Sequence, residues 1–473
     1  MRRTPCMATA MVIYLYFIVY GMVVIIMSQH SSHLQLQWGA TEGQVLQAIS
    51  GVGIGKIIGP SFAGFLSDRF GRRLSVLTGL VMVMIFLGGL LVSPNWQVGF
   101  ALALFFGLAN AVGDTGNYPT LMEIFPKVAG SANVLVKAAI SLGQLALPLV
   151  VTGVAAAGIA WGAPMIALIV ILAVLFAIQL RAPFPDYRAL AAAQRAELDA
   201  AAQAAERAAA PAARSCVGID GAALVLYGFC ATAMFWLAQN TLPMLGVHLA
   251  GMSESAGRSL VSSYSIGSFI GVFVTATLVA RFVRPVTILS VNPVVAGLAY
   301  VGLLLSTNPG AFHACAFVIG FSAAGGLFQL TVVVLAEFFP LRKGVVTSMV
   351  GLASGAAAFA LPYVSGLLVG DASNAVSSYR QVLGMGVGVA VAAALLGLFV
   401  RYRHQHILGS ARAVTPPRGA PRAACRGAAP PVDPGQRSAA RDRRCLLPVA
   451  RPTGSRRRSR EASSRRARTL VPS

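Results

Sequence analysis

Long apolar stretches separated by short polar segments follow one another along the chain from residue 7 to residue 400. A membrane-spanning helix needs about 20 mostly apolar residues, and twelve of these stretches are long enough. The pattern predicts spans near residues 7–27, 43–66, 74–92, 96–122, 131–157, 163–181, 218–242, 258–280, 285–306, 311–336, 344–369 and 381–400. A longer polar interruption after the sixth span divides them into two sets of six.

The spans and the polar segments between them predict four parts of the chain. We expect an N-terminal six-helix half over 1–181, a cytoplasmic linker over 182–217, a C-terminal six-helix half over 218–405 and a disordered Arg- and Pro-rich tail over 406–473. The predicted fold class is therefore all-α and polytopic, with twelve transmembrane helices in two six-helix halves. We expect the protein to be a monomer in the lipid bilayer.

The composition agrees with a protein embedded in a membrane. Hydrophobic residues make up 56% of the chain and charged residues only 11%, less than half the share found in ordinary soluble domains. Such a chain cannot cover a water-exposed surface, which excludes a soluble enzyme, a secreted disulfide scaffold and a disordered chain. The six cysteines show no metal-binding spacing, so free thiols and no metal site are expected.

The net charge of +22 is concentrated near the C-terminal end of the chain. Residues 410–473 contain 16 Arg and three acidic residues without apolar periodicity. A segment of this composition cannot bury enough apolar surface to fold, and a frame-shifted end of the reading frame would also produce it. We therefore expect no nucleic-acid partner.

The distribution of basic residues orients the predicted spans. With the N-terminus in the cytoplasm, the inner segments before the tail contain 17 Lys and Arg residues, and the outer loops contain two, Arg258 and Arg380. Because cytoplasmic loops are enriched in Lys and Arg, both termini are predicted to be cytoplasmic. In the first outer loop, His30 and His33 are expected to be solvated.

The two halves share sequence features at one offset of 214 residues. The motif Glu-Ile-Phe-Pro at 123–126 corresponds to Glu-Phe-Phe-Pro at 337–340, and Pro148 corresponds to Pro362. Internal repeats of this kind are typical of transporters that are built from two related halves.

Residues 64–73, between the second and third spans, read GFLSDRFGRR. This segment resembles the signature loop of the major facilitator superfamily, and the spans and the repeat extend the resemblance over residues 1–405. It implies a secondary transporter that works by alternating access. Segments 113–123, 132–138 and 317–326 resemble the Ydi-type inner-membrane transport proteins of bacteria, which implies a multi-pass protein of the inner membrane.

Charged residues at the cytoplasmic helix ends are candidates for a gate. In the superfamily, the equivalents of the aspartate and arginines of the signature loop lock the inner ends of the halves in one state and release them in the other. The resemblance assigns a cytoplasmic gate to Asp68, Arg69, Arg72 and Arg73, with Glu123 and Glu337 as partners.

Three ionisable residues fall within predicted spans, where a charge costs roughly 2.5–3.5 kcal/mol on insertion scales and is a functional candidate. By the helical rise, Lys56 lies about 18 Å and Asp114 about 13 Å from the inner surface. In one interpretation Lys56 binds an anionic substrate and Asp114 carries the coupling proton; in the other, the two form a permanent structural ion pair. Lys137 is either a second anion contact or an interfacial anchor.

Polar and aromatic residues in the spans complete the candidates. Asn117, Gln144 and Gln329 lie in helices that line the cavity in the superfamily, and helix–helix hydrogen bonding is the alternative role. Further candidates, for which packing is the alternative, are Tyr14, Tyr16, Tyr20, Trp236, Gln239 and Asn240.

The chain contains no catalytic or nucleotide-binding motif, so no enzyme activity and no cofactor are expected and a gradient must drive transport. Two intramembrane lysines and one aspartate favour symport of a small organic anion with a proton as the coupling ion. A proton-coupled efflux antiporter for drugs or metabolites is the alternative, although export of cationic drugs would predict more acidic residues. A membrane receptor that reuses the fold is a third interpretation.

Overall fold

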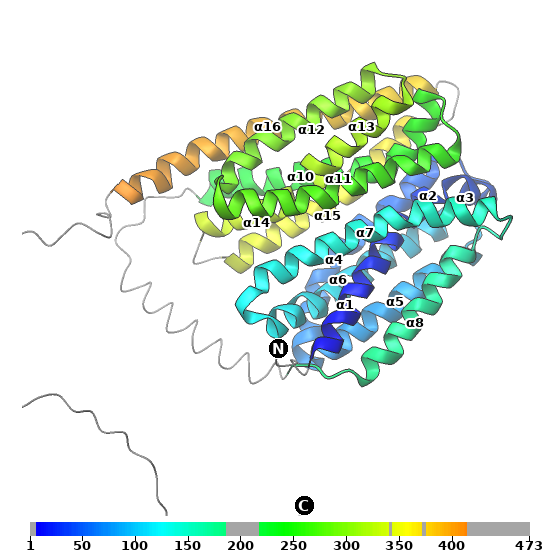
Figure 1. Ribbon diagram of the computed structural model, residues 1–473, viewed down its shortest axis with the longest axis horizontal. Helices are drawn as coiled ribbons and strands as arrows, with labels where there is room; N and C mark the ends of the chain where they lie inside the picture. The colour runs from blue at the N-terminus through cyan, green and yellow to red at the C-terminus, as the bar shows by residue number, and fades with distance from the viewer. Residues whose placement is uncertain (1–5, 186–216, 340–342, 371–374, 414–473) are drawn as a thin grey trace, which may run out of the picture. The chain divides into compact units, whose positions relative to one another are not determined.

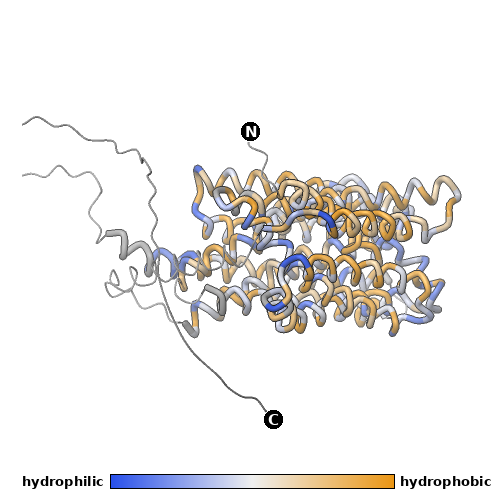
Figure 2. Tube along the Cα trace, turned by 90° about the horizontal axis from the view of Figure 1, so that it is seen from below, coloured by the Kyte–Doolittle hydropathy of each residue, from blue (hydrophilic) through white to orange (hydrophobic). Residues whose placement is uncertain are grey.

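The computed structural model describes residues 6–185, 217–339, 343–370 and 375–413. All regular elements in these ranges are helical (Figure 1). Twelve spans within the described ranges are long and apolar enough to cross a membrane. Apolar residues occupy most of the length of these helices (Figure 2), as a lipid environment requires.

The first half contains six spans and three short helices. Its elements are α1 (Met7–Val24), α2 (Ile26–Gln29), α3 (Ser31–Trp38), α4 (Glu42–Phe70), α5 (Arg72–Val92), α6 (Trp96–Ile124), η1 (Pro126–Val128), α7 (Ala129–Ala156) and α8 (Ala163–Arg181).

The second half contains the other six spans, one of them formed by three successive elements. They are α10 (Val217–Ala250), α11 (Glu254–Arg281), α12 (Pro285–Leu305), α13 (Pro309–Ile319), η2 (Gly320–Ala324), α14 (Leu327–Phe338), α15 (Lys343–Val369) and α16 (Ala375–Ala413).

The structure differs from the sequence prediction in three places. The first predicted outer loop folds into α2 and α3, and His30 between them is 1% exposed, so the expectation that it is solvated was wrong. The tenth span is interrupted by the π-helical turn η2. The last helix, α16, continues to Ala413 and so includes the beginning of the segment assigned to the tail. Most of the predicted linker and the rest of the tail lie outside the described residues.

Polar residues at the helix ends set where several spans begin and end. Thr41 and Gln44 form a capping box at the start of α4, and Asn95 accepts a hydrogen bond from the backbone N–H of Val98 at the start of α6. Gly71 separates α4 from α5 with a φ of 94°, a conformation that glycine adopts readily. Gly71 thus forms the turn within the GFLSDRFGRR segment.

Two helix crossings join the halves: α4 packs on α15, and α7 packs on α11. At the first crossing, Gly53 lies against the backbone of Gly355 and Phe359 so closely that a Cβ atom would collide with it. At the second, the hydroxyls of Ser141 and Ser268 share a hydrogen bond of 3.0 Å. Small residues allow helices to approach this closely in membranes.

Several side-chain contacts between the halves lie at the end of the bundle that contains α2 and α3 (Figure 1). There, Arg258 donates a hydrogen bond of 3.0 Å to the Gln29 carbonyl, and Glu42 and His248 form a 2.9 Å pair. This is the outer end in the orientation predicted from the charge bias. The halves are thus closed together at this end.

Candidate functional site

Lys56, Asp114 and Lys137 lie at mid-depth on α4, α6 and α7, and all three are half-buried. Lys56 interacts electrostatically with both Asp114 and Lys137, so the three residues belong to one cluster. Asp114 makes no hydrogen bond and no ion pair within 4.0 Å to any described residue. The direct Lys56–Asp114 ion pair of the structural interpretation is therefore not formed in this conformation.

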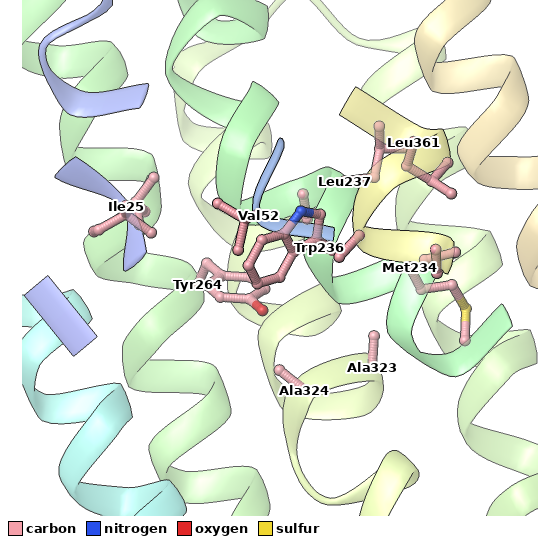
Figure 3. Packing of buried hydrophobic residues seen from close by; sticks show 14 of the residues in the cluster. Ile25, Val52, Met234, Trp236, Leu237, Tyr264, Ala323, Ala324 and Leu361 are labelled. Carbon is pink, nitrogen blue, oxygen red and sulfur yellow. The ribbon is translucent and has the colours of Figure 1, made fainter. Parts of the chain in front are cut away.

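Both lysine side chains reach aromatic rings of the opposite half. The Lys56 ammonium lies 4.7 Å from the ring centre of Trp236, and the Lys137 ammonium lies 5.3 Å from that of Phe235. Figure 3 shows Trp236 of α10 among the buried side chains that include Val52 of α4 and Tyr264 of α11. The cluster is therefore located between the halves, with its charges on one side and aromatic faces on the other.

A tyrosine-rich wall surrounds Asp114 on the side of the first half. Tyr16, Tyr20 and Tyr118 each interact electrostatically with its carboxylate. Gly113 leaves the space in front of Tyr16 open, since a Cβ atom there would lie 3.2 Å from the tyrosine hydroxyl. Asp114 therefore lies near three tyrosine side chains of its own half.

Buried amide groups complete the cluster, and several of their polar atoms have no partner. Gln144 donates a 2.9 Å hydrogen bond to Gln239 across the halves. Buried atoms without a hydrogen-bond partner among the described residues include Asn117 Oδ1, Gln144 Oε1, Trp236 Nε1, Gln239 Nε2 and Asn240 Oδ1. Because buried polar groups are nearly always hydrogen-bonded, these atoms are candidates for contact with a polar ligand or water.

Two sequence candidates lie apart from this cluster. Gln329 on α14 is exposed, and no described hydrogen bond or ion pair joins it to the other candidates. Tyr14 donates a 3.1 Å hydrogen bond to the Ala132 carbonyl and so ties α1 to α7. The structure also adds Phe235, which sequence reasoning missed because an aromatic residue in an apolar helix gives no signal of its own.

The predicted gate residues make contacts within their own halves. Arg72 lies 3.5 Å from Glu123, and both residues belong to the first half. Glu337 instead pairs with His404 at 3.0 Å, and both belong to the second half. Arg69 lies over the rings of Phe65 and Phe70, and Arg73 lies over Phe184. The side chain of Asp68 is outside the described residues.

The model of the Major Facilitator Superfamily matches residues 6–259 and 224–448. The chain belongs to this superfamily. The inner membrane transport protein YdiN of Escherichia coli is 33% identical over 405 residues, covering 86% of this chain and 93% of YdiN. The MFS-type transporter YfkL of Bacillus subtilis is 34% identical over 368 residues, covering 77% of this chain and 90% of YfkL.

Solved structures share the fold. A D-xylose–proton symporter superimposes with a TM-score of 0.64 at 15% identity, over 83% of this chain and 97% of the symporter. The nucleoside transporter NupG gives a TM-score of 0.64 at 12% identity, over 84% of this chain and 99% of NupG. The predicted twelve-helix fold in two halves and the Ydi-type resemblance are confirmed.

The protein is a multi-pass inner-membrane transporter of small molecules rather than an enzyme. A superfamily transporter exposes one central site alternately to each side of the membrane. The cluster around Lys56 and Asp114 lies between the halves, beside crossings that close one end of the molecule. Its position is the one that alternating access requires of a transport site.

Proposed function

We propose that the protein carries a small organic anion together with a proton into the cell, at a site formed by Lys56, Asp114, Asn117, Lys137 and Gln144. The observation that supports this most directly is the environment of the two lysines. Both ammonium groups lie between the halves, and aromatic rings of the second half are their described partners there.

The two lysines favour an anionic substrate. An ammonium group at membrane depth loses most of its hydration, and an aromatic face compensates for only about 0.5–2 kcal/mol of that loss. A carboxylate placed between Lys56 and Lys137 would supply charge-assisted hydrogen bonds to both, which are roughly twice as strong as neutral ones. It would also relieve the repulsion between the two lysines.

The unpartnered amide atoms favour a substrate that carries hydroxyl groups. Asn117 and Gln144 each keep a buried carbonyl oxygen without a donor, and Gln239 and Trp236 keep donors without an acceptor. A hydroxyl group both donates and accepts, so it can satisfy atoms of either kind. We therefore expect a hydroxylated carboxylate to bind more tightly than its deoxy counterpart.

Asp114 is suited to carry the coupling proton. Its carboxylate is half-buried beside tyrosines, without a hydrogen bond from a described residue to stabilise the charged form. A proton on Asp114 removes the negative charge that would repel an anion in the same cluster. Binding of the proton and of the anion would therefore favour each other, which is the requirement for symport.

The charged residues at the cytoplasmic ends complete the proposal as the gate of the opposite side. The arginines next to Asp68, namely Arg69, Arg72 and Arg73, would pair with Glu337 when that end closes. In the described conformation Glu337 is held by His404 and Glu123 by Arg72, within their own halves. Gln329 would then line the path on the cytoplasmic side of the site.

Uptake into proteoliposomes under an inward proton gradient tests the anion site. Matched pairs of labelled acids, malate with succinate and lactate with propionate, test the hydroxyl preference.

Lys56→Gln should reduce uptake about ten- to a hundredfold, since a charge-assisted hydrogen bond contributes about 1.5–3 kcal/mol, whereas Lys56→Arg should retain part of the uptake. Arg281→Gln removes an exposed charge outside the cluster and should leave uptake unchanged. Equal uptake by Lys56→Gln and wild type would refute the site.

Exchange without a gradient separates binding from proton coupling. Asp114→Asn should lose gradient-driven uptake but still exchange internal for external substrate, whereas Lys56→Gln should lose both activities. If a preloaded anion instead leaves the vesicles against its own gradient as protons enter, the protein is an efflux antiporter and the direction proposed here is wrong.

A further inference from the structure

A second polar cluster lies between the halves at the closed end, well away from Lys56 and Asp114. It surrounds a cavity of about 270 Å³ lined by residues of both halves. The first half contributes Gln29, Ser32 and Glu42, and the second contributes His248 and Arg258, among others. Both amide atoms of Gln29 are buried there without a hydrogen-bond partner. The halves thus meet at this end through polar and charged side chains.

Three contacts join the halves around this cavity: Arg258 with the Gln29 carbonyl, Ser32 with Glu254, and Glu42 with His248. Only the last of them contains a histidine. Glu42 begins α4 in the first half, His248 lies in the last turn of α10, and His248 Nε2 is 2.9 Å from Glu42 Oε2. The side chains are 19% and 32% exposed, respectively, so water and protons reach both. A neutral His248 can only donate a hydrogen bond to Glu42, whereas a protonated one forms an ion pair with it.

The other charged and titratable groups that face His248 do not share this behaviour. The ring of Tyr379 on α16 stacks on the imidazole at 4.7 Å between ring centres. Arg258 on α11 pairs with Glu254 at 2.7 Å and donates to the Gln29 carbonyl. An arginine stays charged at all relevant pH values, so the hydrogen bond from Arg258 to the Gln29 carbonyl joins the halves independently of pH. Histidine is the side chain whose ordinary pKa, about 6.5, lies in the physiological range.

His30 is the other histidine near this cavity, and it is unsuited to sense protons. It lies between α2 and α3 with 1% of its surface exposed, and its Nδ1 is 3.0 Å from the Ile26 carbonyl. Burial lowers the pKa of His30 to about 4, so it stays neutral in the range where His248 would titrate. Protonation at this end therefore centres on the Glu42–His248 pair.

We propose that His248 and Glu42 form a proton-binding latch on the outer side of the protein. A proton taken from the outer solution by His248 converts the hydrogen bond between the halves into an ion pair and holds this end closed. Loss of the proton weakens the pair and favours opening. The latch rests on the alternating-access part of the proposed function, but it does not depend on the substrate or on the role of Asp114.

The latch would give the transporter a second proton-dependent step. An acidic outer solution would favour closure of the outer end after loading and so commit the substrate to the inside. The proton on His248 need not cross the membrane, because the pair opens and closes on the same side. External acid would then stimulate the conformational change even in a variant that has lost the coupling proton.

Distance measurements between spin labels test the latch without any substrate. Labels at Leu36 on α3 and Leu305 at the end of α12, which are 83% and 80% exposed, report the separation of the halves at this end. They are introduced into full-length protein with its native cysteines replaced, in lipid nanodiscs between pH 5.5 and 8.5. The open-to-closed ratio should rise about two- to fivefold with pH, the range expected for a partly exposed ion pair.

Four variants identify the group that causes the pH dependence of the label distance. His248→Gln and Glu42→Gln should each abolish the pH dependence of the label distance. Asp114→Asn should retain the pH dependence, and so should His313→Gln, whose imidazole bonds Ser263 within the second half. A distance that does not vary with pH in the wild type, or that still varies in both latch variants, overturns the proposal. Loss of the response in Asp114→Asn alone would assign it to the central site and overturn the latch equally.

Because the label measurement needs no substrate, its outcome is separable from that of the uptake assay. Absence of anion uptake with an intact pH response would reject the proposed substrate and keep the latch. Normal uptake with no pH response at this end would keep the proposed substrate and reject the latch.

Discussion

The ammonium of Lys56 on α4 lies 4.7 Å from the centre of the Trp236 ring on α10, in the opposite half of the transporter. The aromatic ring is thus a partner for an ammonium group that forms no ion pair within 4.0 Å with a described residue. An arriving anion would compete with the ring for the same ammonium. The contact therefore connects occupancy of the site to the relation between the halves.

Substitutions of Trp236 separate the contribution of its aromatic face from that of its indole N–H group. Trp236→Phe keeps an aromatic face but removes Nε1, a donor without a partner in the described structure. We expect the KM for the transported acid to rise about two- to tenfold, the effect of one lost hydrogen bond. Trp236→Leu also removes the ring and should raise KM further. Trp161→Phe, at an aromatic cluster with His30 and His33, is the matched control. An unchanged KM in Trp236→Leu would exclude this residue from the site.

A double-mutant cycle distinguishes an anion site from a structural ion pair at Lys56 and Asp114. Because no ion pair within 4.0 Å joins them, their coupling in stability should stay below about 1 kcal/mol. The double variant Lys56→Gln/Asp114→Asn should fold as well as either single variant and should not recover uptake. Thermal unfolding in detergent measures the coupling. Restored stability or uptake in the double variant would support the structural interpretation.

The sequence predicted the spans well because each requires its own run of apolar residues, which is a local property. The prediction failed where packing between distant parts of the chain determines the local structure. The residues of α2 and α3 look like a polar outer loop, yet they fold against the bundle and bury His30. The π-helical turn η2 divides the tenth span, although the apolar pattern runs through it without interruption.

The sequence likewise indicates the charged residues of the candidate site but not the residues that surround them. Lys56, Asp114 and Lys137 stand out in sequence because a charge at membrane depth is costly. Their partners do not stand out, since Phe235 and Trp236 are ordinary residues in an apolar helix until the halves come together. The same holds for Glu42 and His248, which are 206 residues apart. Glu337 pairs with His404 of its own half in this conformation, and its role at the cytoplasmic gate stays a prediction.

The approach of α4 to α15 should be sensitive to one methyl group. A Cβ atom at Gly53 would collide with the backbone of Phe359, which cannot move aside as a side chain can. Gly53→Ala should therefore oppose closure of the halves by roughly 1–3 kcal/mol and lower the uptake rate. Gly153→Ala on α7, where a Cβ atom meets no atom within 4 Å, should be tolerated. Uptake and the Leu36–Leu305 label distance measure the effect, and equal behaviour of the two variants would contradict it.

The two residues of an ion pair within the second half should contribute unequally to stability when each is replaced alone. Asp220 on α10 is 2% exposed and accepts hydrogen bonds of 2.7 and 2.9 Å from Arg403 on α16. The arginine side chain is 29% exposed, so it can still reach water when Asp220 is replaced.

The carboxylate of Asp220 is 2% exposed, so it does not reach water in this way. Arg403→Gln should therefore destabilise the protein by about 3 kcal/mol, more than Asp220→Asn, because it leaves a buried charge without its main partner. Adding Asp220→Asn to Arg403→Gln should recover part of that loss, since it removes the buried charge. Arg380→Gln, at an exposed position, should change the free energy of unfolding by less than about 0.5 kcal/mol. Thermal unfolding of the four variants gives the order, and a double variant less stable than Arg403→Gln would show that the carboxylate is not the source of the instability.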